Sequence, residues 1–115
     1  METVAEWDRA FRVWHYSVSY RQLLLRSLTE ESPSRVDVLF SNVRFLHGAT
    51  EWEQLEISVD PDFRAPGSPA FHDVPGKWFV LNGGAGYLHA THCQWHEDDG
   101  NAMTPSRFGP LKRTD

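Results

Sequence analysis

Side chains able to bind a metal or attack a substrate are concentrated in one run, His89-Ala90-Thr91-His92-Cys93-Gln94-Trp95-His96-Glu97-Asp98-Asp99. Zinc favours His and Cys in tetrahedral geometry, so His89, His92 and His96 are the candidate metal ligands. In a strand, His92 and His96 share a face, but their backbones are ~13 Å apart, too far to share an ion unless the strand bends. A helix would place them one turn apart. Apolar neighbours and the preceding Asn-Gly-Gly turn favour strand, so we expect surface histidines, no metal site and no cofactor.

The other motifs with possible chemistry lack the context that each chemistry needs. Cys93 near a His could form a nucleophile pair, but strand cysteines are usually buried and inert. The acidic run at 97–99 lacks the alternating oxygen ligands and distal Glu of a calcium loop. The glycines at 83–86 are followed by no helix and no Lys-Ser or Lys-Thr pair, so a phosphate loop is excluded. We therefore predict no catalytic residue, and whether the protein is an enzyme stays open, with a non-enzyme favoured.

Aromatic residues offer a different kind of site. Trp14, Tyr16 and Tyr20, with Arg12 and Arg21 nearby, are the candidate partner-binding residues. Simple alternation along the strand places Trp14, Tyr16 and Val18 on one face and Phe11, Val13 and His15 on the other. The alternative is that both faces are buried in the core.

Length and charge limit the classes of partner. The chain has 115 residues, a net charge of -5 and a single cysteine. This length is typical of one domain, 1–115, with a core at about 11–100 and an irregular tail at 101–115. The chain lacks the basic surface expected of a nucleic-acid binder, and it cannot form an internal disulfide. No apolar run is long enough to span a bilayer and no signal peptide is visible, so we expect no membrane partner and a cytoplasmic location.

Strand patterns dominate the elements that must position these side chains. Thr3 and Glu6 have capping-box spacing, which predicts one short helix over 3–10. Proline and glycine at 60–76 predict a long loop of functional or mobile character. Asn82-Gly83-Gly84 is typical of a hairpin turn. We expect strands at 11–18, 23–27, 35–40, 43–46, 53–59, 77–81 and 86–95.

This count predicts a mostly β protein, a small antiparallel sandwich or a barrel-like sheet. The strand at 53–59 has the clearest alternation, with Leu55, Ile57 and Val59 on the dry face. We expect these three residues and Val36 or Val38 to be buried.

Three short segments carry a resemblance to a known set of sequences. They are Ser19 to Ser27, which contains Gln-Leu-Leu-Leu-Arg-Ser, then Arg35-Val36-Asp37-Val38-Leu39-Phe40, and finally His96-Glu97-Asp98. With these motifs, residues 11–106 resemble a set of small uncharacterised bacterial proteins. The resemblance implies a bacterial source and no established activity, and it assigns no functional residue.

The sequence thus favours a small non-enzymatic protein-binding module, with an immunity-like or inhibitor-like protein as one form of it. The alternative is a small-molecule or metal-binding β-barrel, with or without enzymatic activity, that uses His89, His92 and His96. The expected partner is another protein, and the oligomeric state is left open.

Overall fold

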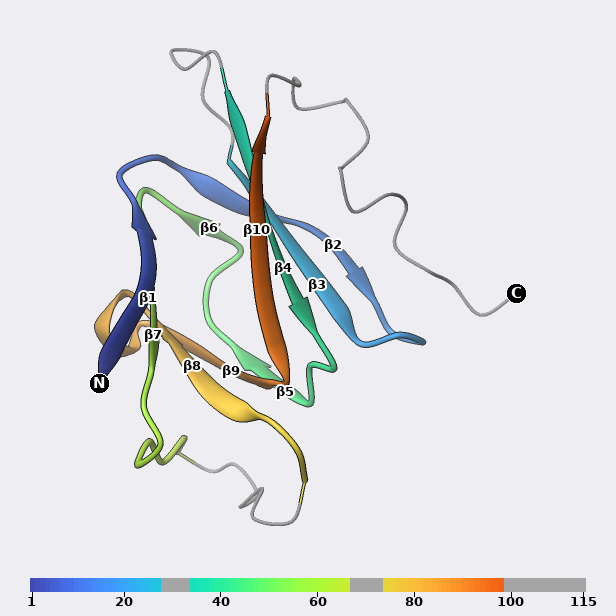
Figure 1. Ribbon diagram of the computed structural model, residues 1–115, viewed down its shortest axis with the longest axis vertical. Helices are drawn as coiled ribbons and strands as arrows, with labels where there is room; N and C mark the ends of the chain where they lie inside the picture. Colours follow the sequence, from blue (N-terminus) through green and yellow to red (C-terminus); the bar gives the residue numbers. More distant parts are fainter. Residues whose placement is uncertain (28–33, 67–73, 99–115) are drawn as a thin grey trace.

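The computed structural model describes residues 1–27, 34–66 and 74–98. These residues form two five-stranded antiparallel sheets (Figure 1). Sheet I has the order β1 (Glu2–Trp7), β7 (Leu55–Val59), β8 (Lys77–Leu81), β9 (Gly86–Ala90), β5 (Phe45–His47). Sheet II has the order β10 (His92–Asp98), β4 (Arg35–Ser41), β3 (Gln22–Ser27), β2 (Phe11–Ser17), β6 (Glu51–Trp52). The prediction of a mostly β, single compact domain is confirmed. The predicted tail at 101–115 lies outside the described residues.

The β8–β9 hairpin confirms the predicted turn. Asn82, Gly83 and Gly84 form a short 3-10 turn, η1 (Asn82–Gly84), and all three have positive φ angles, of 49°, 71° and 114°. Asn and Gly tolerate this region of backbone space better than other residues do. The Asn82 amide also donates to the Gln54 carbonyl at 2.8 Å and accepts from the Glu56 N–H at 2.7 Å. The turn is thereby fixed to the start of β7.

The predicted helix at 3–10 is wrong, because Glu2–Trp7 is strand β1. It pairs antiparallel with β7, from Glu2 opposite Val59 to Trp7 opposite Leu55. An eight-residue helix is marginal by itself. Pairing with β7 satisfies backbone groups on one side of the segment and lets Trp7 pack against the core.

The predicted single strand at 86–95 is also wrong, because the chain bends at Thr91. β9 lies in sheet I and β10 lies in sheet II. The chain also crosses from sheet II to sheet I between β4 and β5, where Asn42 has a φ of 56°. The Thr91 N–H donates to the Ser41 carbonyl at 3.0 Å, and the Arg44 N–H donates to that of His89 at 2.8 Å. Two neighbouring segments therefore turn one corner together and join the sheets.

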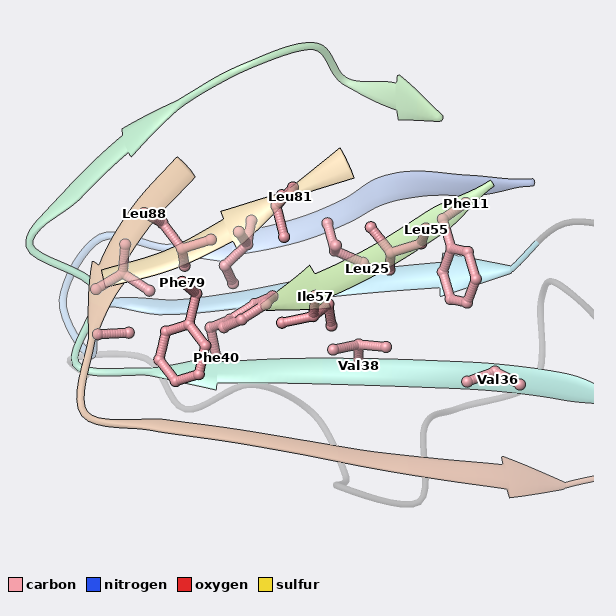
Figure 2. Close-up of a cluster of buried hydrophobic side chains, with 13 residues drawn as sticks. Phe11, Leu25, Val36, Val38, Phe40, Leu55, Ile57, Phe79, Leu81 and Leu88 are labelled. Atoms are coloured by element: carbon pink, nitrogen blue, oxygen red, sulfur yellow. The ribbon is translucent and has the colours of Figure 1, made fainter. Parts of the chain in front are cut away.

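The hydrophobic core fills the space between the two sheets, and Figure 2 shows the side chains pointing inward from both. Val36, Val38 and Ile57 have no exposed surface, and Leu55 is 1% exposed, as predicted. Val59 is only partly buried and packs against the same cluster. The other core side chains come from both sheets and from the segment between β4 and β5: Phe11, Leu23, Leu25, Phe40, Val43, Phe79, Leu81, Leu88 and Ala90.

A cluster of aromatic side chains, separate from the core, covers the outer face of sheet I. Its centre is Tyr87, which stacks with His47 at 4.8 Å between ring centroids and contacts Phe63 at 5.0 Å. Phe63 follows β7 in the predicted long loop, so the described part of that loop packs on the sheet. Trp78 contacts both Phe63 and Phe45. These rings shield the outer face of sheet I from solvent.

Candidate partner-binding surface

The candidate surface is the end of the β2–β3 hairpin, where the chain reverses over residues 18–21. Arg21 has a φ of 52°, which closes the turn. The Tyr20 N–H donates to the buried Ser17 hydroxyl at 3.4 Å. The Arg21 carbonyl accepts from the Val43 N–H at 2.8 Å. These two bonds tie the turn to its own strand and to the segment between β4 and β5, so its residues are held in place.

Three large apolar side chains are exposed at this end of the hairpin. Tyr16 is 40% exposed, Val18 is 78% exposed and Tyr20 is 41% exposed. We call Tyr16, Val18 and Tyr20 the hairpin patch. The sequence predicts the two tyrosines as partner-binding residues and places Val18 on the face of Tyr16, but the exposure of Val18 is known only from the structure. Large exposed apolar patches mark interaction sites, and these three residues lie within five positions of one another in the chain.

Trp14 does not belong to the patch, because a register shift between Val13 and His15 changes the alternation. Tyr16 lies opposite the core residue Leu23, whereas His15 lies opposite Leu24 on the outer face. A bulge adds one residue to a strand, so side chains after it change face. Trp14 instead packs on the outer face against Leu24 and Leu39. The predicted common face of Trp14, Tyr16 and Val18 is therefore wrong.

A row of four charged residues and one histidine crosses the outer face of sheet II, one residue from each strand. The register places Glu51, Arg12, Arg26, Asp37 and His96 next to one another in that order. Directly opposite residues in an antiparallel sheet share a face, so the five side chains form one line. No local pattern predicts this row, because its members are up to 84 residues apart in the chain.

Burial differs sharply along the row. The Arg26 guanidinium binds the Asp37 carboxylate at 2.8 Å and 3.2 Å, and both side chains are almost fully buried. Arg26 also lies over the Trp14 ring, 4.9 Å from its centroid. The Arg12–Glu51 pair is 3.1 Å apart, but its side chains are at least half exposed. The Arg26–Asp37 pair is thus a buried ion pair, while the Arg12–Glu51 pair is a solvent-exposed contact.

The three candidate metal ligands lie in different surroundings. His89 is buried on the outer face of sheet I, with its ring 5.2 Å from Trp78, and burial together with the Arg44 charge lowers its pKa. His92 is exposed beyond the corner, with Nδ1 2.8 Å from the Thr91 hydroxyl. His96 lies opposite Asp37. Among the described residues, no three His, Cys, Asp or Glu side chains come close enough to hold a metal.

Cys93 has the properties of a core cysteine. It packs against the main cluster, and burial raises the pKa of its thiol to about 12. The thiolate is the nucleophilic form, so at neutral pH almost none of the reactive species is present.

Comparison with known proteins gave no match: no family model, curated protein or solved structure corresponds to this chain. In the part of the chain that the structure describes, no helix has the length and apolar character needed to cross a bilayer.

Proposed function

We propose that the protein is a non-enzymatic protein-binding module and that the hairpin patch is its contact with the partner. The observation that carries the proposal is the exposure of Tyr16, at the end of β2, and of Val18 and Tyr20, on a turn fixed by backbone and hydroxyl hydrogen bonds. A turn that is already ordered loses little conformational entropy when it binds. Exposed tyrosines beside such a turn therefore supply contact area with little loss of conformational entropy on binding.

The composition of the turn supports a protein partner. Tyr and Arg are enriched among residues that dominate binding energy at interfaces, and the turn contains Tyr20 and Arg21 side by side. Arg21 is exposed and is available to contact a carboxylate or a carbonyl. An immunity-like or inhibitor-like role, in which a small acidic protein covers part of another protein, is one form of this proposal.

The test starts with a photo-reactive amino acid at position 18, introduced into the protein in the cell that produces it. A protein cross-linked there is identified, purified and titrated against the wild-type chain. Replacement of both tyrosines, Tyr16→Ser with Tyr20→Ser, is expected to weaken binding by about 30-fold or more, the scale of an interface hot spot.

Val4 supplies the matched control, because it is 38% exposed and lies on β1, in the other sheet. Val4→Ser is expected to leave the affinity unchanged, and a photo-reactive group at position 4 is expected not to capture the same protein. If nothing is captured at position 18, or if the tyrosine variant binds as tightly as wild type, the proposal is wrong.

A further inference from the structure

Among the residues that the structure describes, the four sheet edges differ in how well they are protected, and β10 is the least protected. β5 and β6 have three and two residues, and β1 contains a register shift between Thr3 and Ala5. β10 pairs with β4 over seven residues, His92–Asp98, without a shift. Proteins usually protect edges by short strands, bulges, Lys or Pro, because an open edge presents unpaired backbone groups. The sequence of β10, HCQWHED, has neither Lys nor Pro, and its two acidic residues, Glu97 and Asp98, stand at one end of the strand, away from Trp95.

Aromatic side chains lead from the core to this edge. Phe11 is 1% exposed in the core, and its ring centroid lies 5.4 Å from that of Trp7. Trp7 in turn contacts Trp95 edge-on at 5.7 Å. Trp95 is 44% exposed and occupies the middle position of β10. The row of rings therefore ends on a large apolar side chain at the centre of an open edge.

We propose that β10 pairs antiparallel with β10 of a second copy of this chain, about a two-fold axis at Trp95. The pairing joins two copies of sheet II into one ten-stranded sheet. It satisfies the backbone groups of β10 that have no partner strand within the described part of the chain, and it places the two Trp95 rings against each other across the axis. Two-fold interfaces of this kind use the same surface on both copies.

The residues of β10 suit this self-pairing. In the register centred on Trp95, Gln94 lies opposite His96 and Cys93 lies opposite Glu97. No like charges face each other at these positions, and opposed like charges would destabilise a strand pair. A second copy therefore fits the edge both in hydrogen bonding and in charge.

The mass of the purified chain tests the pairing, measured by light scattering during gel filtration. We expect a species of twice 13.2 kDa at about 100 µM protein, with dissociation on dilution. Gln94→Lys brings two lysines close together across the axis and is expected to weaken the dimer at least tenfold. Gln54→Lys makes the same change at an exposed residue just before β7 and is expected to leave the mass unchanged. A monomer at about 100 µM overturns the proposal.

Hydrogen exchange then locates the interface. Backbone amides of β10 are expected to exchange more slowly at high protein concentration, while those of β1 stay unchanged. Concentration-dependent protection at the β2–β3 hairpin instead would mean that the chain self-associates through the hairpin patch, and the β10 proposal would be wrong. The test is independent of the proposed function, because Tyr16→Ser with Tyr20→Ser is expected to leave a β10 dimer intact.

Discussion

Replacing Asp37 with Asn removes one charge from the buried pair while keeping the shape of the side chain. Arg26 would then stay buried with its main countercharge gone. Removing one partner of a buried ion pair costs about 3–5 kcal/mol, because the remaining charge is neither hydrated nor compensated. The two bonds of 2.8 Å and 3.2 Å and the near-complete burial of both side chains place this pair in that class. The loss is large against the roughly 5–15 kcal/mol that typically stabilises a domain.

Urea unfolding followed by tryptophan fluorescence measures this free energy. Arg12→Met is the control, because it breaks the exposed Arg12–Glu51 pair of the same row and is expected to cost about 1 kcal/mol or less. The double variant Arg26→Met with Asp37→Leu removes both charges and is expected to cost less than Asp37→Asn alone. An Asp37→Asn loss no larger than that of Arg12→Met would refute the view that burial sets the strength of this pair.

Three further measurements test other parts of the structure. Ile57→Ala is expected to destabilise the protein by about 2–5 kcal/mol in urea unfolding, since the side chain is fully buried, and a loss below about 0.5 kcal/mol would contradict its core position. The lowered pKa of His89 means that the folded state resists its protonation, so the stabilisation is complete above pH 6.5 and is lost as the pH falls below that value; His89→Gln should flatten this part of the profile. Metal analysis should find no stoichiometric zinc, and a chelator should leave Tm unchanged, because His92 and His96 are four positions apart along a strand; one zinc per chain, removed by His92→Ala or His96→Ala, would reverse this expectation.

Local pattern was sufficient wherever a strand carries its own signal. Leu55 and Ile57 alternate with polar residues, and the residues at 82–84 tolerate positive φ, so β7 and the β8–β9 turn could be predicted. β1 could not, because its partner lies about 50 residues later and the local capping signal favoured a helix. Pairing with a distant strand outweighed that signal.

The candidate surface was predictable in composition but not in geometry. The extra residue at Trp14 sends it to the opposite side of the sheet from Tyr16, and no residue type nearby reveals the bulge. The corner at Thr91 likewise separates His89 from His92 and places them in different sheets. The bulge at Trp14 and the corner at Thr91 both depend on how the two sheets pack together. The local order of residue types does not carry this information.

The structure also explains the two longer motifs of the sequence resemblance. The Gln-Leu-Leu-Leu-Arg-Ser segment is β3 and the Arg-Val-Asp-Val-Leu-Phe segment is β4, and these strands are neighbours. The Arg of the first motif is Arg26 and the Asp of the second is Asp37, the two members of the buried pair. In these two motifs, Arg26 and Asp37 therefore link neighbouring strands on the outer face of sheet II.

The order of the strands has a consequence for synthesis on the ribosome. β4 can pair with β10 only after β10 has been synthesised, about 55 residues later in the chain. In the same way, β1 can pair with β7 only after β7 has been synthesised. Until β10 has emerged, sheet II lacks its outer strand and Trp7 lacks its contact with Trp95. Pairings between distant segments slow folding, because a long loop must close before the contact forms. The nascent chain therefore keeps one side of β4 without its strand partner until β10 has left the exit tunnel, and sheet II is completed only then.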